Sequence, residues 1–151
     1  MNTMNTKELF DEIYEYMINY DHARVPHGYS TDAISLLTRY NYYTYKEIIN
    51  RKHSGSLKVE VDDNKVNDFK DRVDYYFEEN SPGDYEYRDF IKYISLYLTF
   101  IVRKSLHPVG IKSKDMTVTK DNNKFYCTGK KRFIKDRNSL CKYCVSRSKS
   151  N

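Results

Sequence analysis

The chain has 151 residues, a length typical of one domain, and 39% of them are hydrophobic, enough to form a core without disulfides. No apolar run reaches the ~20 residues of a membrane-spanning helix, since the best candidate, Ile91 to Val102, is shorter and contains Lys92. The first residues carry neither the basic start nor the apolar stretch of a secretory signal. We therefore expect a cytoplasmic protein without membrane contact.

Charge is divided unevenly along the chain. Residues 1–100 carry 12 Lys and Arg against 18 Asp and Glu, a net charge of −6, whereas residues 101–151 carry 14 against 3, a net charge of +11. The two parts therefore face different electrostatic surroundings. We expect a helical part over residues 1–105 and a basic, Cys-containing hairpin part over residues 106–151, packed on it as a single folding unit.

Most of the acidic part has apolar residues spaced three and four apart, which is typical of amphipathic helices. The first predicted helix follows Asn5, which forms the pattern of a capping box with Glu8, and runs to about residue 20. A polar loop comes next, and Ser30 can cap a second helix. Thr44 and Glu47 repeat the capping pattern and predict a further short helix of its own.

The second half of the helical part predicts two longer helices. After an extended piece over residues 57–61, an apolar stripe from Val66 to Phe77 predicts one amphipathic helix. The next helix is predicted from about Pro82 to Lys104, because proline is favoured at the first helical position. Its central residues are apolar on several faces, so we expect it to be the most buried helix of the fold.

The periodicity changes after Pro108, which ends the last helix. Residues 116–119 and 124–127 alternate in polarity around the turn-forming residues 121–123, a pattern that predicts a β-hairpin. Residues 146–151 have no apolar side chain to dock, and we expect a frayed tail. The predicted fold class is mainly α, a bundle-like domain of four or five helices with a small C-terminal β-hairpin module.

All three cysteines lie in the last 25 residues, which indicates a local site rather than a disulfide framework. Cys141 and Cys144 have the spacing at which two thiolates from a tight turn can bind one metal ion, and Cys127 can supply a third thiolate. His107, on the turn before the hairpin, is the nearest histidine in the sequence. We predict that these four residues bind zinc and staple the hairpin to the end of the central helix.

Other interpretations of these residues remain open at the level of sequence. An iron–sulfur cluster is also held by thiolates, so it is the alternative cofactor. The cysteines could instead carry out thiol or disulfide chemistry, or be ordinary buried thiols. His107 could be a cation beside a helix C-terminus, in which case a carboxylate or a second chain would take the fourth position.

Three short runs carry a resemblance to a known family: His107 to Gly110, Phe125 to Cys127, and Leu140 to Cys144. Together they resemble the C-terminal signature of an uncharacterised family of small methanogen proteins, over roughly the last 45–55 residues. The resemblance implies a methanogenic archaeon as the source and a reducing, anaerobic cytoplasm. It implies no reaction.

The C-terminal part places cations among aromatic rings, so groups that neutralise phosphates alternate with rings on which bases stack. We therefore predict a binding module, with nucleic acid as the leading partner. The predicted contact residues are Lys124, Tyr126, Lys130, Lys131, Arg132, Phe133, Lys135 and Arg137. The alternative is a solvated basic surface, or one that faces the acidic helices.

No common enzyme class is indicated, because the sequence lacks a glycine-rich phosphate loop, HExxH and GxSxG. Catalysis would need an open metal site, or Cys127 as a nucleophile activated by His107. A separate candidate cluster consists of Asp21, His22, His27 and Asp32.

A protein partner or self-association is the third functional hypothesis. Four tyrosines are too close in sequence for all of them to face inward on a single helix: Tyr40, Tyr42, Tyr43 and Tyr45. Some ring surface is therefore expected to be exposed, and tyrosine favours interfaces because its ring packs while its hydroxyl forms hydrogen bonds.

Overall fold

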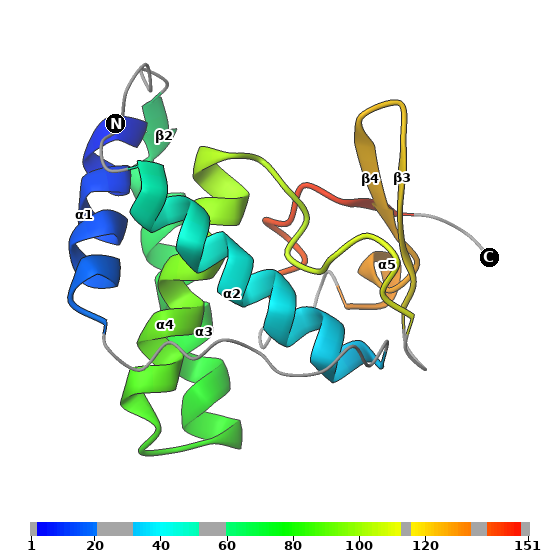
Figure 1. The fold of residues 1–151 in the computed structure, drawn as a ribbon, viewed down its shortest axis with the longest axis horizontal. Helices are drawn as coiled ribbons and strands as arrows, with labels where there is room; N and C mark the ends of the chain where they lie inside the picture. The colour runs from blue at the N-terminus through cyan, green and yellow to red at the C-terminus, as the bar shows by residue number, and fades with distance from the viewer. Residues whose placement is uncertain (1–2, 21–31, 52–59, 113–115, 134–138, 149–151) are drawn as a thin grey trace.

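A computed structural model describes residues 3–20, 32–51, 60–112, 116–133 and 139–148 of the chain. Helices dominate these residues and pack together, with a small sheet to one side (Figure 1). The helices are α1 (Thr6–Ile18), α2 (Ala33–Arg51), α3 (Asp63–Asn80), α4 (Tyr85–Leu96), a π-helix (Tyr97–Ile101) and the short α5 (Lys130–Phe133). The predicted mainly helical fold is confirmed. None of the described helices has the length and apolar character needed to cross a membrane.

The first helix begins as predicted, because the side chain of Asn5 accepts a hydrogen bond from the backbone N–H of Lys7 at 2.8 Å. Asn5 also ends the short strand β1 (Thr3–Asn5), which pairs antiparallel with β2 (Glu60–Asp62). This pairing is a feature that the sequence analysis did not predict. It fixes the starts of α1 and α3 beside each other, since α3 follows β2 directly.

The prediction of a separate helix at Thr44 is wrong, because α2 runs without a break through this position. The hydroxyl of Thr44 donates to the carbonyl of Tyr40 at 2.8 Å, one turn earlier on the same helix. The side chain is therefore used inside the helix and does not cap a new one. Thr44 is also buried against the core, as is Ile48 one turn later.

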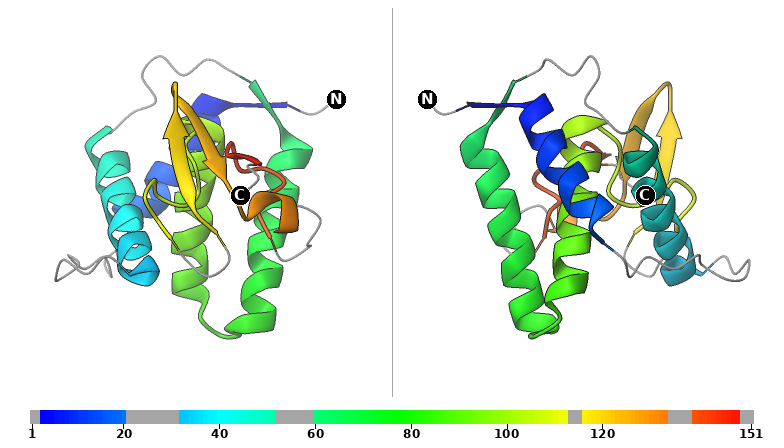
Figure 2. Two further views of the ribbon diagram at one scale, coloured as in Figure 1. Left: turned by 90° about the vertical axis from the view of Figure 1, so that its right-hand side faces the viewer. Right: turned by 60° about the vertical axis from the view of Figure 1, so that its left-hand side comes forward.

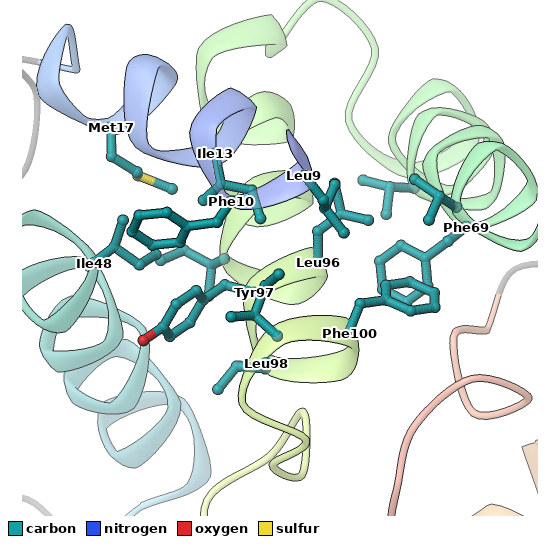
Figure 3. Packing of buried hydrophobic residues seen from close by; sticks show 14 of the residues in the cluster. Leu9, Phe10, Ile13, Met17, Ile48, Phe69, Leu96, Tyr97, Leu98 and Phe100 are labelled. Atoms are coloured by element: carbon teal, nitrogen blue, oxygen red, sulfur yellow. The ribbon is translucent and has the colours of Figure 1, made fainter. Parts of the chain in front are cut away.

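The most buried helix changes its geometry near its end. It is α-helical from Tyr85 and passes into the π-helix at Tyr97, so the α-helical part is shorter than predicted. All five residues of the π-helix are buried. Figure 3 shows Tyr97 on the side of α2 and Phe100 beside Phe69 of α3, with the two phenylalanine rings 5.4 Å apart. The wider turn thus buries neighbouring residues on two sides of one helix.

The predicted β-hairpin is confirmed, with strands β3 (Val118–Asp121) and β4 (Lys124–Cys127) joined through two asparagines of positive φ, although β3 begins and ends two residues later than the predicted 116–119. A third strand, β5 (Arg147–Ser148), pairs parallel with β4. The expectation of a frayed tail is therefore wrong for residues 146–148. Ser146 is buried, and its hydroxyl donates to that of Ser105 at 2.7 Å. Polar hydrogen bonds, rather than apolar side chains, dock this segment.

Two apolar clusters position the functional residues. The larger lies among α1, α2, α3, α4 and the π-helix (Figure 3), and the partly buried Leu140 and Tyr143 pack against it. The smaller consists of Ile111, Val118 and Cys127, packed against the start of α2. Figure 1 and the left view of Figure 2 show the C-terminal segment, drawn in red, between the helices and the hairpin.

Candidate functional site

A cavity of about 740 Å³ lies between the helices and the C-terminal part of the chain. Its helical wall includes Leu37 of α2, Val73 and Phe77 of α3, and Ile91 of α4. The lining also includes all four predicted metal ligands, which are His107, Cys127, Cys141 and Cys144. Residues from three separate segments of the C-terminal part therefore meet at one cavity.

Cys127 reaches the cavity from the end of strand β4. Its backbone pairs with Val118 of β3 on one side and with Ser148 of β5 on the other. The side chain is buried, with 7% of its surface exposed, in the smaller apolar cluster. This cysteine is thus fixed by a strand that has a neighbour on each side.

Cys141 and Cys144 lie on a tight turn, as their spacing predicted. The backbone N–H groups of Tyr143 and Cys144 both donate to the carbonyl of Leu140, at 3.0 and 3.1 Å. The N–H of Cys141 donates to the hydroxyl of Ser139 at 3.0 Å. Since Leu140 and Tyr143 pack on the helical core, the turn has an apolar attachment to the helices and also carries two thiols that line the cavity.

Polar contacts to α3 hold this turn in place. The hydroxyl of Tyr143 donates to the carboxylate of Asp68, and this hydrogen bond holds the pKa of Asp68 below its ordinary value. Arg72 donates to the same carboxylate at 3.1 Å and to the carbonyl of Ser139 at 3.2 Å. Its guanidinium group also lies 5.6 Å from the centre of the Tyr143 ring. Charge-assisted bonds therefore dock the turn onto one face of α3.

His107 lies between the π-helix and the hairpin. The turn that follows it is closed by the N–H of Ile111, which donates to the carbonyl of Pro108 at 3.2 Å, and by Gly110, whose φ of +93° favours glycine. Burial lowers the pKa of His107, so its imidazole is neutral at pH 7. A neutral imidazole keeps one ring nitrogen with a free electron pair, which is the form that binds metal ions.

The Cys141 thiol is affected by its burial and by the other two cysteines. Burial raises the pKa of the Cys141 thiol, and negative charge on Cys144 and on Cys127 raises it further. Leu106, which precedes His107, contacts one of the thiols, since its N–H donates to the sulfur of Cys144 at 3.5 Å. All three cysteines are free of disulfides.

The side chains do not form a coordination sphere as they stand. Across the described ranges, no group of three or more His, Cys, Asp or Glu side chains is arranged so that it could hold a metal ion. The structure therefore brings the four predicted ligands to one cavity without closing them around a common point. The presence and identity of a metal stay predictions.

The basic residues predicted to contact nucleic acid have different surroundings. Lys124 is exposed on β4, while Tyr126 and Phe133 are half-buried. Lys130 points inward and donates to two backbone carbonyls. Lys131 and Arg132 lie on α5. Lys135 and Arg137 lie outside the described residues.

The other candidate residues are placed as follows. Asp21, His22 and His27 lie outside the described residues, and Asp32 accepts hydrogen bonds from the N–H and hydroxyl of Ser35 at the start of α2. Of the four tyrosines on α2, Tyr43 is 65% exposed and the others are half-buried. The hydroxyl of Tyr40 donates to the carbonyl of Ser105 at 2.6 Å.

Residues 2–149 match the family described as "Uncharacterized protein conserved in archaea (DUF2115)". The chain belongs to this family. The resemblance to an uncharacterised archaeal family is thereby confirmed, whereas the C-terminal signature itself is not. The match extends over nearly the whole chain, and the family description names no activity.

Two relatives come from methanogens. "UPF0305 protein MJ0646" of Methanocaldococcus jannaschii is 26% identical over 160 residues, which cover 96% of this chain and 97% of that protein. A "UPF0305 protein" of Methanothermobacter thermautotrophicus is 27% identical over 128 residues, covering 83% of this chain and 77% of that protein. No solved structure matches the chain.

Proposed function

We propose that this family member is a metal-binding protein in which Cys127, Cys141, Cys144 and His107 hold one Zn²⁺. The observation that carries the proposal is that these four side chains, predicted as ligands from the sequence, line one cavity. The ion fastens the hairpin and the thiol turn to the end of the buried helix. Three thiolates and one imidazole are a common ligand set for structural zinc.

The electrostatics of the cavity support this proposal. Burial and the two neighbouring cysteines raise the pKa of the Cys141 thiol, and a divalent cation bound among the thiols would stabilise its thiolate. The neutral imidazole of His107 needs to lose no proton before it binds. The N–H of Leu106, 3.5 Å from the sulfur of Cys144, is a contact of the kind that orients a thiolate ligand.

Binding requires the side chains to turn toward a common point, because the described residues do not surround an ion as they stand. Rotation about the Cα–Cβ bond moves a cysteine sulfur among three staggered positions, and the proposal requires such a rotation. The backbones of Cys127 and of the thiol turn stay in place, held by strand pairing and by the hydrogen bonds to Leu140.

Titration of the metal-free protein with Co²⁺ tests the proposal, since cobalt replaces zinc in tetrahedral sites and its absorption reports thiolate ligands. We expect strong absorption that saturates at one Co²⁺ per chain and weakens in Cys144→Ala. The matched control is Met116→Leu, which changes another sulfur-containing residue of the same cavity without removing a thiolate. If the absorption spectrum of the added Co²⁺ remains that of the hydrated ion, the proposal is overturned.

A second proposal is that the hairpin binds nucleic acid. It is supported by the exposed Lys120 and Lys124 beside Phe125, with the Lys120 ammonium group 5.5 Å from the centre of the Phe125 ring. Because each phosphate contact releases counterions, the affinity for a single-stranded oligonucleotide should fall steeply between two salt concentrations in a filter-binding measurement. Lys124→Glu should weaken binding, and Lys7→Glu on α1 should not. Affinity that is absent or indifferent to salt would contradict it.

A further inference from the structure

Lys130 makes two short hydrogen bonds inside the C-terminal part. Its ammonium group donates to the carbonyl of Cys144 and to the carbonyl of Ser146, each at 2.6 Å. Lys130 is the first residue of α5, three positions after Cys127. Its side chain therefore links α5, which follows Cys127, to the segment from Cys144 to Ser146. Composition alone had suggested that this lysine faces a phosphate.

The charge of Lys130 is not matched by a carboxylate in the part of the chain that the structure describes, because its partners there are two neutral carbonyls. Two other charged residues line the same cavity: Arg72, which is paired with Asp68, and Asp84, which lies on the turn between α3 and α4. Lys130 is thus a basic residue on the cavity wall whose hydrogen-bond acceptors are neutral carbonyls.

A zinc ion with three thiolates and one neutral imidazole carries a net charge of −1. Such a site is stabilised by a nearby cation, and groups that orient the ligands through the backbone affect the affinity for the metal. Ammonium has three donors, of which the two carbonyls use two. The third is a donor from which a metal-bound thiolate could accept a hydrogen bond.

We propose that Lys130 is a positioning residue of the metal site: it holds the carbonyls of Cys144 and Ser146 so that the thiol turn faces Cys127, and it balances the negative charge of the metal–thiolate group. This inference rests on the proposed function. It separates Lys130 from the exposed lysines of the hairpin, which have no such contacts.

The test compares three variants of the full chain by competition for Zn²⁺ against a chromophoric chelator. Lys130→Met removes the charge and the donors while keeping the length of the side chain, and we expect its zinc affinity to fall about 10- to 100-fold. Lys130→Arg keeps the charge and the donors and should stay within a few-fold of the unchanged protein. Lys124→Met, which removes an exposed charge from the same hairpin, should bind zinc normally.

A second readout needs no metal. In the metal-free protein, Lys130→Met should speed amide hydrogen exchange in residues 140–148 and leave the exchange of the core helices unchanged, because the two carbonyl contacts are lost. Lys130→Arg should restore the protection. If the unchanged protein binds no zinc, the proposed function fails, and this readout still decides whether Lys130 positions the turn.

Two results would overturn the inference about Lys130. One is a zinc affinity of Lys130→Met equal to that of the unchanged protein. The other is an equal loss in Lys130→Met and Lys124→Met, since this would assign the effect to the overall charge of the hairpin. If Lys130→Met does not fold, the test is the comparison of Lys130→Arg with Lys124→Met. The inference then requires that Lys130→Arg still binds zinc tightly.

Discussion

Tyr97 is completely buried, yet its hydroxyl reaches two charged groups. It donates to the carboxylate of Glu47 at 2.5 Å and accepts from Arg51 at 3.3 Å, so it ties the π-helix to α2. The carboxylate is also 3.5 Å from the ammonium group of Lys104. The π-helix is therefore fixed by a small charged network at the edge of the core, in addition to its apolar contacts.

Removal of this hydroxyl should lower the stability of the fold. In Tyr97→Phe the ring stays and the hydrogen bonds are lost, so we expect the free energy of unfolding to fall by about 1 kcal/mol near neutral pH. Glu47 keeps access to water, which limits the loss. Urea unfolding followed by circular dichroism measures the difference, and Tyr43→Phe, on an exposed ring, should be neutral. Equal losses in the two variants would contradict this assignment.

Alkaline pH provides a second test of the same residue. Burial and, second to it, the hydrogen bond to the carboxylate of Glu47 together raise the pKa of Tyr97 from 10.0 to about 12. The unfolded chain therefore loses this proton first, so the stability from Tyr97 is complete below pH 10 and is lost as the pH rises toward 12. The free energy of unfolding should fall more steeply over this range in the unchanged protein than in Tyr97→Phe. Parallel slopes would contradict the shifted pKa.

At the scale of elements, the hairpin turn has a backbone geometry that few residues adopt. Asn122 and Asn123 have φ values of 50° and 66°, which suits the twist of a two-residue hairpin. Glycine adopts this conformation without strain, whereas a β-branched residue does not. We expect Asn123→Gly to preserve or raise the protection of amides in β3 and β4, and Asn123→Val to lower it by a free energy of about 1–2 kcal/mol. Hydrogen exchange at these strands is the measurement, and equal protection in both variants would contradict the turn geometry.

Much of the local structure could be predicted because its causes are local. The cap at Asn5 and the turn at Asn122 each depend on residues within a few positions, and the structure contains both. The break predicted at Thr44 was wrong because its hydroxyl bonds back to Tyr40, a choice decided by burial in the core. The π-helix contacts α1, α2 and α3 through Tyr97 and Phe100, and contacts between such distant segments are not revealed by spacing along one of them.

The candidate site, too, could be predicted from the sequence only in part. The chemistry of thiols and imidazole predicted four residues around one ion. All four line one cavity, but no three of the described side chains of this kind are arranged to hold an ion, so the site stays a prediction. The inward direction of Lys130 could not be predicted, since a sequence shows that a residue is charged but not which way its side chain points. The docking of Ser146 was missed for a similar reason, because a single buried pair of hydroxyls leaves no periodic pattern.

At the scale of the whole molecule, the helices have a large apolar core of their own, whereas the C-terminal part has a small one. If the binding of a metal ion is coupled to folding, its removal should first destabilise the C-terminal part, which has the smaller apolar core. We expect chelation to speed hydrogen exchange in residues 107–145 while the core helices keep their protection. Simultaneous loss of protection in both parts would contradict a metal that fastens only the C-terminal part.

The central claim is that the three cysteines and His107 hold one zinc ion. Metal analysis of protein purified without oxygen tests this claim most directly, because the result depends on no substitution and on no assumed partner. The account predicts one zinc per chain. It also predicts that substitution of Cys127, Cys141 or Cys144 removes this zinc. Iron in place of zinc would indicate an iron–sulfur centre, and a chain that carries no metal would contradict the account.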